Sequence, residues 1–279
     1  MINLAALPAP EVIEVLDYET EYQELMARFR EAMGEGWSAA LESDPVVKLL
    51  EQVAYERMLM RARINDAARA VLLAHSRGGD LDNLLALLGA ERLEGEGDGA
   101  FRERGRLAPL GFSTAGPAAA YRYHARSAHP DVADVQVTRP VPGEVQISVL
   151  SRVGDGAPAQ GLLSTVAAAL NAEDVRPLSD TVTVVAARIR PWSAKAVLHF
   201  PSGAAIDPVM AEARRAVAAY AAAQHRVGAA VRIGGINAAL YQAGVENVEL
   251  TSLAADIESA EGVAPYCTGV ELTAVVDYV

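Results

Sequence analysis

The amino-acid sequence predicts an α+β protein, in which an all-helical N-terminal segment is followed by small modules of a helix with a β-hairpin or small sheet. Two observations support this prediction. Over the first hundred residues, apolar side chains recur every three to four positions, which is the spacing of one helix face. After Phe101 the pattern changes to short helices followed by runs in which apolar and polar residues alternate, the period of a β-strand.

The composition allows a large core and argues against several classes of function. Of the 279 residues, 51% are hydrophobic and 22% are charged, so the chain can fold, and its length suggests about two domains. Aromatic residues make up only 5%, so the core must consist mostly of alanine, valine and leucine. The net charge of -12 repels phosphate and argues against a nucleic-acid partner. No apolar run reaches the ~20 residues of a membrane span, so no membrane contact is expected.

Three helices are expected in the first hundred residues. The first ends near Gly34, and the second, over residues 44–75, begins at a capping Asp44 followed by Pro45. A short leucine-rich helix follows, capped by Asp80. The apolar positions of the second helix are Val46, Leu49, Leu50, Val53, Met60, Ile64, Ala67, Ala68 and Val71.

The segment Glu94–Gly99 alternates acidic residues and glycines. It has no apolar anchor, so we expect a linker or an exposed loop and place the first domain boundary there. The expected domains are a helical segment over 1–100, a middle α+β part over 101–200 and a C-terminal α+β module over 201–279.

The rest of the chain predicts alternating helices and strands. Two of the predicted strands have similar sequences, because Val132–Thr138 resembles Val245–Thr251. Each of them follows a predicted helix that contains tyrosine. A duplicated module is one explanation and chance similarity of strand-like residues is the other. Helices are expected over 117–127, 162–170, 207–228 and 236–241, and strands over 132–137, 145–149, 182–184, 194–200, 245–251 and 270–275.

Glycine-rich patterns near residue 95 do not define a ligand site. Gly95-x-Gly97-x-x-Ala100 fits the relaxed dinucleotide-binding pattern, but a helix rather than a strand is expected before it. The same run imitates the start of a calcium-binding loop, yet the position of the bidentate glutamate is Gly105. Neither a cofactor nor a metal is therefore expected.

His124, His129 and Asp131 are the candidate groups for acid–base or metal chemistry. Such chemistry needs them to converge on one atom, and nothing in the pattern places them on a common face. Cys267, the single cysteine, is interpreted as a small buried residue, and one cysteine excludes an intrachain disulfide or a cysteine-based zinc site. With hydrolase and phosphate-loop motifs missing from the sequence as well, the residues favour a structural, non-enzymatic protein with several contact surfaces.

Seven short segments, spread through most of the chain, carry a resemblance to a known family. They are Leu7–Pro10, Glu14–Glu19, Glu42–Glu51, Arg63–Val71, Gly111–Pro117, Asp174–Leu178 and Tyr266–Thr268. Together they resemble the baseplate assembly protein J family of contractile-tailed phages and R-type tailocins, in its smaller temperate-phage version. The resemblance implies a structural baseplate wedge protein, assembled in the host cytoplasm and located in the tail baseplate of a phage or tailocin particle.

The resemblance also implies partners. Two copies of such a protein associate with one copy of a second wedge protein, the I-type tail protein, and their N-terminal helices contribute to a helical bundle. Their later domains link neighbouring wedges into a ring around the central hub, together with a sheath-initiator-like baseplate protein. The baseplate rearranges on host attachment and triggers sheath contraction.

The first hundred residues are expected to contact the second wedge protein. The helix over 44–75 has a wide apolar stripe, which packing on its own domain explains as well as assembly does. Residues 201–279, with an alanine-rich helix and a terminal strand, are expected to join neighbouring wedges. The candidate interface residues are Leu25, Phe29, Val46, Leu50, Val53, Met60 and Ile64.

Two other functions stay open at this stage. A hydrolase could use His124, His129 and Asp131 with a further group. A ligand-binding module of the tail tip, for host surface sugars, is the second alternative. It is disfavoured by the few aromatic side chains available for stacking, among them Trp37 and Trp192.

Overall fold

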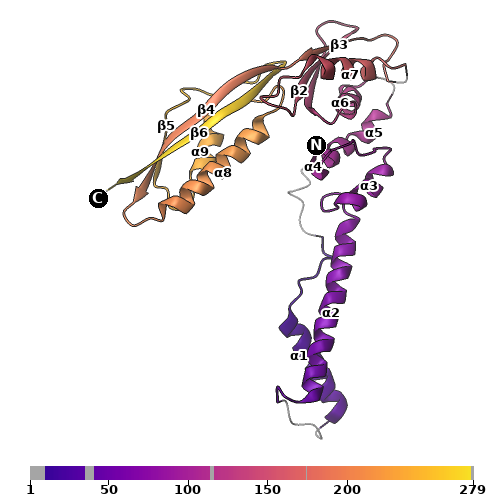
Figure 1. Cartoon of the computed structure of the whole chain (residues 1–279), viewed down its shortest axis with the longest axis vertical. Helices are drawn as coiled ribbons and strands as arrows, with labels where there is room; N and C mark the ends of the chain where they lie inside the picture. The colour runs from indigo at the N-terminus through magenta and orange to yellow at the C-terminus, as the bar shows by residue number, and fades with distance from the viewer. Residues whose placement is uncertain (1–9, 35–40, 114–115, 174, 278–279) are drawn as a thin grey trace. The chain divides into compact units, whose positions relative to one another are not determined.

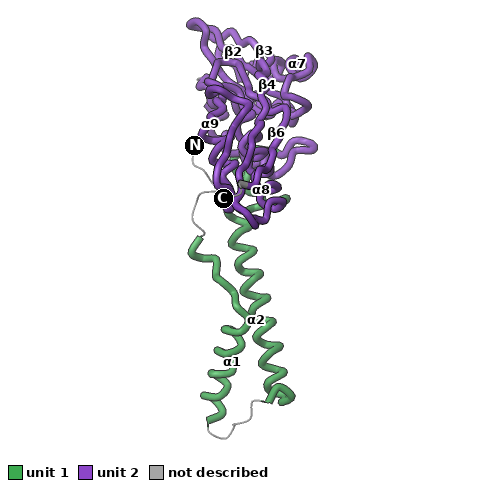
Figure 2. Tube along the Cα trace, turned by 90° about the vertical axis from the view of Figure 1, so that its left-hand side faces the viewer, with its two compact units in different colours: residues 1–91 green, residues 92–279 purple. Residues whose placement is uncertain are grey.

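The computed structural model describes residues 10–34, 41–113, 116–173 and 175–277. The chain divides into two compact units, residues 1–91 and residues 92–279 (Figure 2). Within the described ranges, none of the helices has the length and apolar character that crossing a membrane requires. Trp37, the Leu7–Ala9 part of the first motif, Thr114, Ala115 and Asp174 lie outside the described residues.

The N-terminal unit contains two helices that lie side by side, α1 (Tyr18–Met33) and α2 (Pro45–Ala70), as Figure 2 shows. The Asp44 carboxylate accepts a 2.8 Å hydrogen bond from the N–H of Val46. Pro45 occupies the first turn of the helix, where a backbone N–H has no carbonyl partner within the helix. The predicted start of the long helix is therefore confirmed.

The long helix ends earlier than predicted, at Ala70 rather than at residue 75. From Val71 the chain turns, and the N–H of His75 bonds to the carbonyl of Leu72 at 2.8 Å instead of continuing the helical ladder. The leucine-rich helix, α3 (Gly78–Ala86), begins before Asp80, so this residue lies in the first turn and is not the cap. A carboxylate in the first turn still interacts favourably with the helix dipole.

The second unit opens with three short helices, α4 (Asp98–Gly105), α5 (Ala108–Gly111) and α6 (Ala118–Ser127) (Figure 1). The expectation of a linker or exposed loop over Glu94–Gly99 is correct only in part, because Glu94, Gly95 and Gly97 are exposed and lie outside helices and strands. Asp98 and Gly99 already belong to α4, and Glu96 is buried. An ion pair between Glu96 and Arg104, described below, anchors this segment where no apolar residue does.

The first sheet of this unit has three strands in the order β1-β2-β3, which are Val132–Thr138, Glu144–Ser151 and Thr181–Ala186. β1 and β2 form the predicted hairpin, and β2 pairs with β3 in parallel. The helix α7 (Gln160–Leu170) makes the crossover that a parallel pair requires. Its Val166 and Leu170 are buried against Ile147 and Val149 of β2 and Tyr121 of α6.

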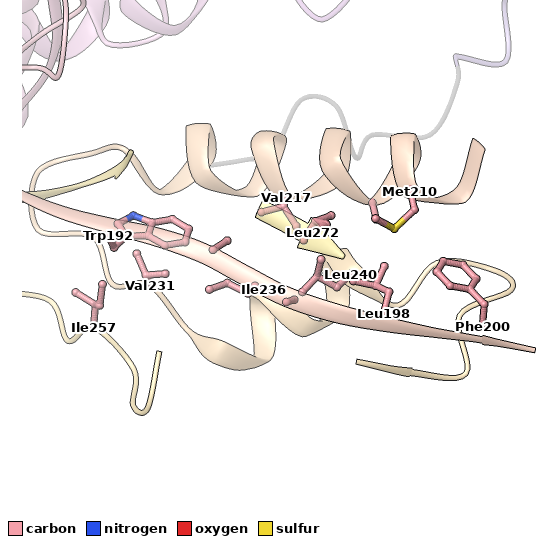
Figure 3. Packing of buried hydrophobic residues seen from close by; sticks show 13 residues of the cluster. Trp192, Leu198, Phe200, Met210, Val217, Val231, Ile236, Leu240, Ile257 and Leu272 are labelled. Atoms are coloured by element: carbon pink, nitrogen blue, oxygen red, sulfur yellow. The ribbon is translucent and has the colours of Figure 1, made fainter. Parts of the chain in front are cut away.

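The second sheet has the order β5-β4-β6, with strands Asn247–Leu250, Arg188–Pro201 and Val263–Asp277. The helices α8 (Ile206–Gln224) and α9 (Ile233–Leu240) supply Met210, Val217, Ile236 and Leu240 to its core. Figure 3 shows these side chains meeting the alternate β4 residues that end in Leu198 and Phe200. The sheet draws on residues on both sides of the expected 200/201 division.

Both long strands extend further than predicted, and each contains a proline. β4 runs through Pro191 and β6 through Pro265. The N–H of Arg188 bonds to the carbonyl of Gly262, so the odd-numbered residues in this part of β4 turn their N–H away from β6. β5 pairs only with residues 196–199 of β4, so Pro191 removes no ladder bond. Pro265 likewise faces the outer edge of β6.

The two sheets have the same strand pattern. In each, a central strand has an antiparallel neighbour on one side and a parallel neighbour on the other. The two segments with matching letters, β1 and β5, are both the antiparallel edge strand. However, β1 precedes its central strand in the chain and β5 follows its own. The fold class is confirmed, and the modules share an arrangement but differ in chain order.

Candidate protein–protein interface

One face of α2 is buried against α1 and the residues before it. Val47 and Ala54 of α2 and Met26 of α1 are at most 3% exposed. The side chain of Asn65 accepts a 3.0 Å hydrogen bond from the N–H of Glu14 and donates one of 2.9 Å to its carbonyl. This pair of bonds holds the extended segment before α1 against α2 in one register.

Charges reinforce the same contact. The carboxylate of Glu21 is 5% exposed and forms ion pairs with Arg57, at 3.4 Å, and with Arg61. Arg61 also lies 2.7 Å from the carboxylate of Glu14. Breaking a buried pair of this kind leaves an uncompensated charge, so α1 is fixed to one face of α2.

A second face of α2 is apolar and exposed. We call it the α2 stripe, and it consists of Leu49, Val53, Met60 and Ile64, which are 63%, 40%, 61% and 62% exposed. These positions are separated by 4, 7 and 4 residues, so at about 100° per residue they share one side of the helix. That side lies about a third of a turn from the buried positions 47, 54 and 65.

The structure separates the seven predicted interface residues by their exposure. Val53, Met60 and Ile64 lie on the exposed α2 stripe. The other four are half-buried. Leu49, which belongs to the same stripe and is 63% exposed, was not among the predicted residues. The four half-buried residues are Leu25, Phe29, Val46 and Leu50.

A further exposed pair, Tyr55 and Leu59, was also not predicted. They are 47% and 44% exposed and lie one helical turn apart, on the flank of α2 away from the stripe. The α1 contact thus leaves apolar side chains open on both sides of it. A helix that is apolar on several sides is typical of the interior of a bundle rather than of a surface helix.

The second unit begins with a buried ion pair between Glu96 and Arg104. Both side chains are 3% exposed, and the carboxylate accepts hydrogen bonds of 2.9 and 2.7 Å from the guanidinium. The guanidinium also donates a 3.2 Å bond to Ser127 at the end of α6 and stacks over Phe101. The ion pair and the bond to Ser127 together connect the start of the unit to α4 and α6.

Burial alone would raise the pKa of the Glu96 carboxyl. The bonds from Arg104, together with a 3.1 Å bond from the N–H of Leu93, outweigh burial and hold this pKa below its ordinary value. Glu96 is therefore ionised at neutral pH and paired.

The three candidate catalytic residues have different partners. The ring of His124 lies 3.2 Å from the carbonyl of Gly111, whereas that of His129 accepts a hydrogen bond from the N–H of Asp131. The His129 ring and the Asp131 carboxylate are 3.7 Å apart and close to half exposed. In the described part of the chain, no three histidine, cysteine, aspartate or glutamate side chains are placed to hold a metal ion.

Comparison with known proteins assigns the chain to a family. Its residues match three family descriptions in order: the Baseplate J-like N-terminal domain over 42–96, the central domain over 113–186 and the C-terminal domain over 193–273. The α2 stripe lies within the first match. The chain therefore belongs to the baseplate J family.

A curated relative is similar over nearly the whole length. Baseplate protein J of Escherichia phage P2 is 42% identical, and the match covers 96% of each chain. The resemblance inferred from the short sequence segments is thus confirmed.

Proposed function

We propose that this protein is a structural, non-enzymatic wedge component of a contractile-tail baseplate, and that α2 is its contact with a second wedge protein of the I type. Membership in the baseplate J family supports the structural role in a phage baseplate. The observation that carries the wedge contact is the α2 stripe, an apolar helix face left open after α1 has packed on α2.

The energetics of the stripe favour a helical partner. Full burial of a large aliphatic side chain contributes roughly 1.5–3 kcal/mol, so four such residues supply several kcal/mol even though they are already partly covered. Their 4-7-4 spacing places them along one straight side of α2, so an apolar helix that lies along this side can contact all four. A second copy of the chain and one I-type protein would then complete a bundle around α1 and α2.

The sheet-containing part of the chain would hold neighbouring wedges together. Residues 201–279 provide α8, α9, β5 and β6, and we propose that the ring around the hub, with the sheath-initiator-like protein, forms through this part. The assembled protein would be located in the baseplate of a phage or tailocin particle, after assembly in the host cytoplasm. The rearrangement that starts sheath contraction would change the contacts between wedges.

Removal of the first unit tests the wedge contact. We expect residues 92–279 to fold, because they form a compact unit with their own cores, but not to co-purify with the co-expressed I-type protein. The full chain is the positive control. Circular dichroism and thermal unfolding check that the fragment is folded. If the folded fragment binds the I-type protein as well as the full chain does, the contact lies elsewhere.

A further inference from the structure

Residues 181–201 form one extended segment that belongs to both sheets. Only Ala187 separates β3 from β4. The N–H of Ala187 donates a 2.9 Å hydrogen bond to the carbonyl of Val149 in β2. The N–H of the next residue, Arg188, donates one of 2.7 Å to the carbonyl of Gly262, just before β6. Hydrogen bonding therefore passes from one sheet to the other between two successive residues.

A small apolar core lies where the two sheets meet. We call residues 118–186 the first sheet module and residues 188–277 the second sheet module, and each has a larger core of its own. Leu150 of β2, Ala187 and Ala264 of β6 are 0%, 4% and 0% exposed and form a separate cluster, the junction cluster. The two modules thus share buried side chains in addition to a strand.

Polar side chains of β1 meet the loops of the second sheet module. Asp134 and Gln136 lie on the face of the first sheet opposite its helix-covered core, because Val135 between them packs in that core. The carboxylate of Asp134 accepts a 3.1 Å hydrogen bond from the N–H of Val227. The side-chain oxygen of Gln136 accepts one of 2.7 Å from the N–H of Gly262. Both bonds join β1 to loops that belong to the other module.

Two glycines allow the modules to approach this closely. Gly228 has a φ of +79°, its N–H donates a 2.7 Å bond to the carbonyl of Val263, and a Cβ atom there would lie 2.8 Å from Nε2 of Gln136. Gly156, in the loop after β2, has a φ of +97°, and a Cβ atom there would lie 2.8 Å from Nε2 of His225 in the second module. Side chains have no room at either position, and such φ values favour glycine.

We propose that the two sheet modules form one rigid body, in which Asp134 and Gln136 are positioning residues, and that this body transmits a displacement from one end to the other without bending at Ala187. A hinge needs residues that can absorb a change of φ and ψ with few contacts. Ala187 is buried and its segment is bonded to both sheets. A bend there would break the two side-chain bonds and open the junction cluster, and both changes cost free energy.

The transmission of a displacement rests on the proposed function, because a rearranging baseplate supplies the displacement. The rigidity of the two modules does not rest on it. It is a property of the free chain and can be measured there.

Distances between two spin labels test the rigidity in the free, full-length chain. Glu144→Cys places one label on an exposed position at the start of β2, and Arg215→Cys places the other on the exposed side of α8. Both are made with Cys267→Ser, which removes the native thiol. Pulsed electron paramagnetic resonance should give one narrow distance distribution. A broad distribution, or one with two separate maxima, would overturn the inference whatever the function of the chain.

A double variant tests the two positioning residues. Asp134→Ala combined with Gln136→Ala should widen the distance distribution. Thr138→Ala is the matched control, because Thr138 is next on the same face of β1 and its hydroxyl bonds within the first module, at 3.4 Å from the carbonyl of Gln146. It should leave the distribution narrow. Circular dichroism checks that each variant is folded, and a folded double variant with an unchanged distribution would overturn the role assigned to these two side chains.

Particles test the transmission. Chain that carries both labels is diluted with unlabelled chain during assembly, so that labels on different copies contribute little, and the particles are measured before and after contraction. The distance should be the same in both states. A distance that changes on contraction would overturn the inference and leave the proposed function standing. Particles that lack the chain altogether would refute the proposed function and with it the transmission, whereas the free chain would still decide the rigidity.

Discussion

Ile64→Asp should abolish binding to the I-type wedge protein and leave the chain folded. Ile64 is 62% exposed, so the substitution should change the free energy of unfolding by no more than about 0.5 kcal/mol. In the complex, the same carboxylate would be buried without a partner. That costs about 3–5 kcal/mol, which weakens binding roughly a hundredfold to several thousandfold.

The matched control for Ile64→Asp is Gln52→Asp. Gln52 is exposed on α2, outside both the buried face and the α2 stripe, and it gains the same charge. Co-purification and calorimetric titration with the I-type protein compare the two variants, and thermal unfolding checks the fold. Leu50→Asp is less informative, because Leu50 is half-buried and its loss would also disturb the packing of α1. Equal binding by both variants would show that the α2 stripe is not the contact.

Arg104→Met should strongly destabilise the second unit. The substitution leaves the Glu96 carboxylate buried and unpaired, which costs about 3–5 kcal/mol. For a unit of this size, each kcal/mol lowers the Tm by about 2–4 °C, so a fall of roughly 6–20 °C is expected. Arg215→Met, which removes an exposed ion pair with Glu212, should change the Tm little.

The pH dependence of this effect follows from the pKa of Glu96. The folded state lowers this pKa below its ordinary value of 4.5, so the stabilisation is complete above the ordinary pKa. It is lost as the pH falls through the lower folded-state pKa. In Arg104→Met, burial without the guanidinium raises the pKa of Glu96, so the difference in unfolding free energy between wild type and variant should begin to shrink above pH 4.5 and shrink further below it. A difference that stays constant down to pH 3 would show that the ion pair does not cause the effect.

The fold class could be predicted because it depends on local periodicity. The 3.6-residue spacing of the first hundred residues and the two-residue alternation around Val145 and Ile147 appear directly in the sequence, and the structure confirms both. Strand ends were less predictable. A proline interrupts a strand only at a position where the ladder needs a backbone N–H, because proline has none. The sequence does not show that Pro191 and Pro265 lie at positions that face unpaired edges.

The burial of Glu96 within Glu94–Gly99 was missed for a similar reason. The segment is anchored by Glu96, and its partner Arg104 lies eight residues away with no periodic pattern to connect them. The amino-acid composition of the segment therefore does not predict a buried ion pair between this acidic, glycine-rich run and the next helix.

The candidate interface was only partly predictable for a related reason. Apolar residues on α2 could be recognised from their spacing, but the spacing alone does not say which of them α1 covers. Only the structure shows that Val47 is buried, at 3% exposed, and that Leu49, two residues further on, is open, at 63% exposed.

Electron microscopy of purified particles tests the central claim most directly. A deletion of this gene is complemented with the wild-type chain, and the baseplate is imaged at a resolution that shows helices and sheets. The account predicts baseplate density that fits the two three-stranded sheets of the second unit and the paired helices α1 and α2 of the first, and no assembled baseplates without complementation. Complete contractile tails with baseplates that assemble without this chain would contradict it.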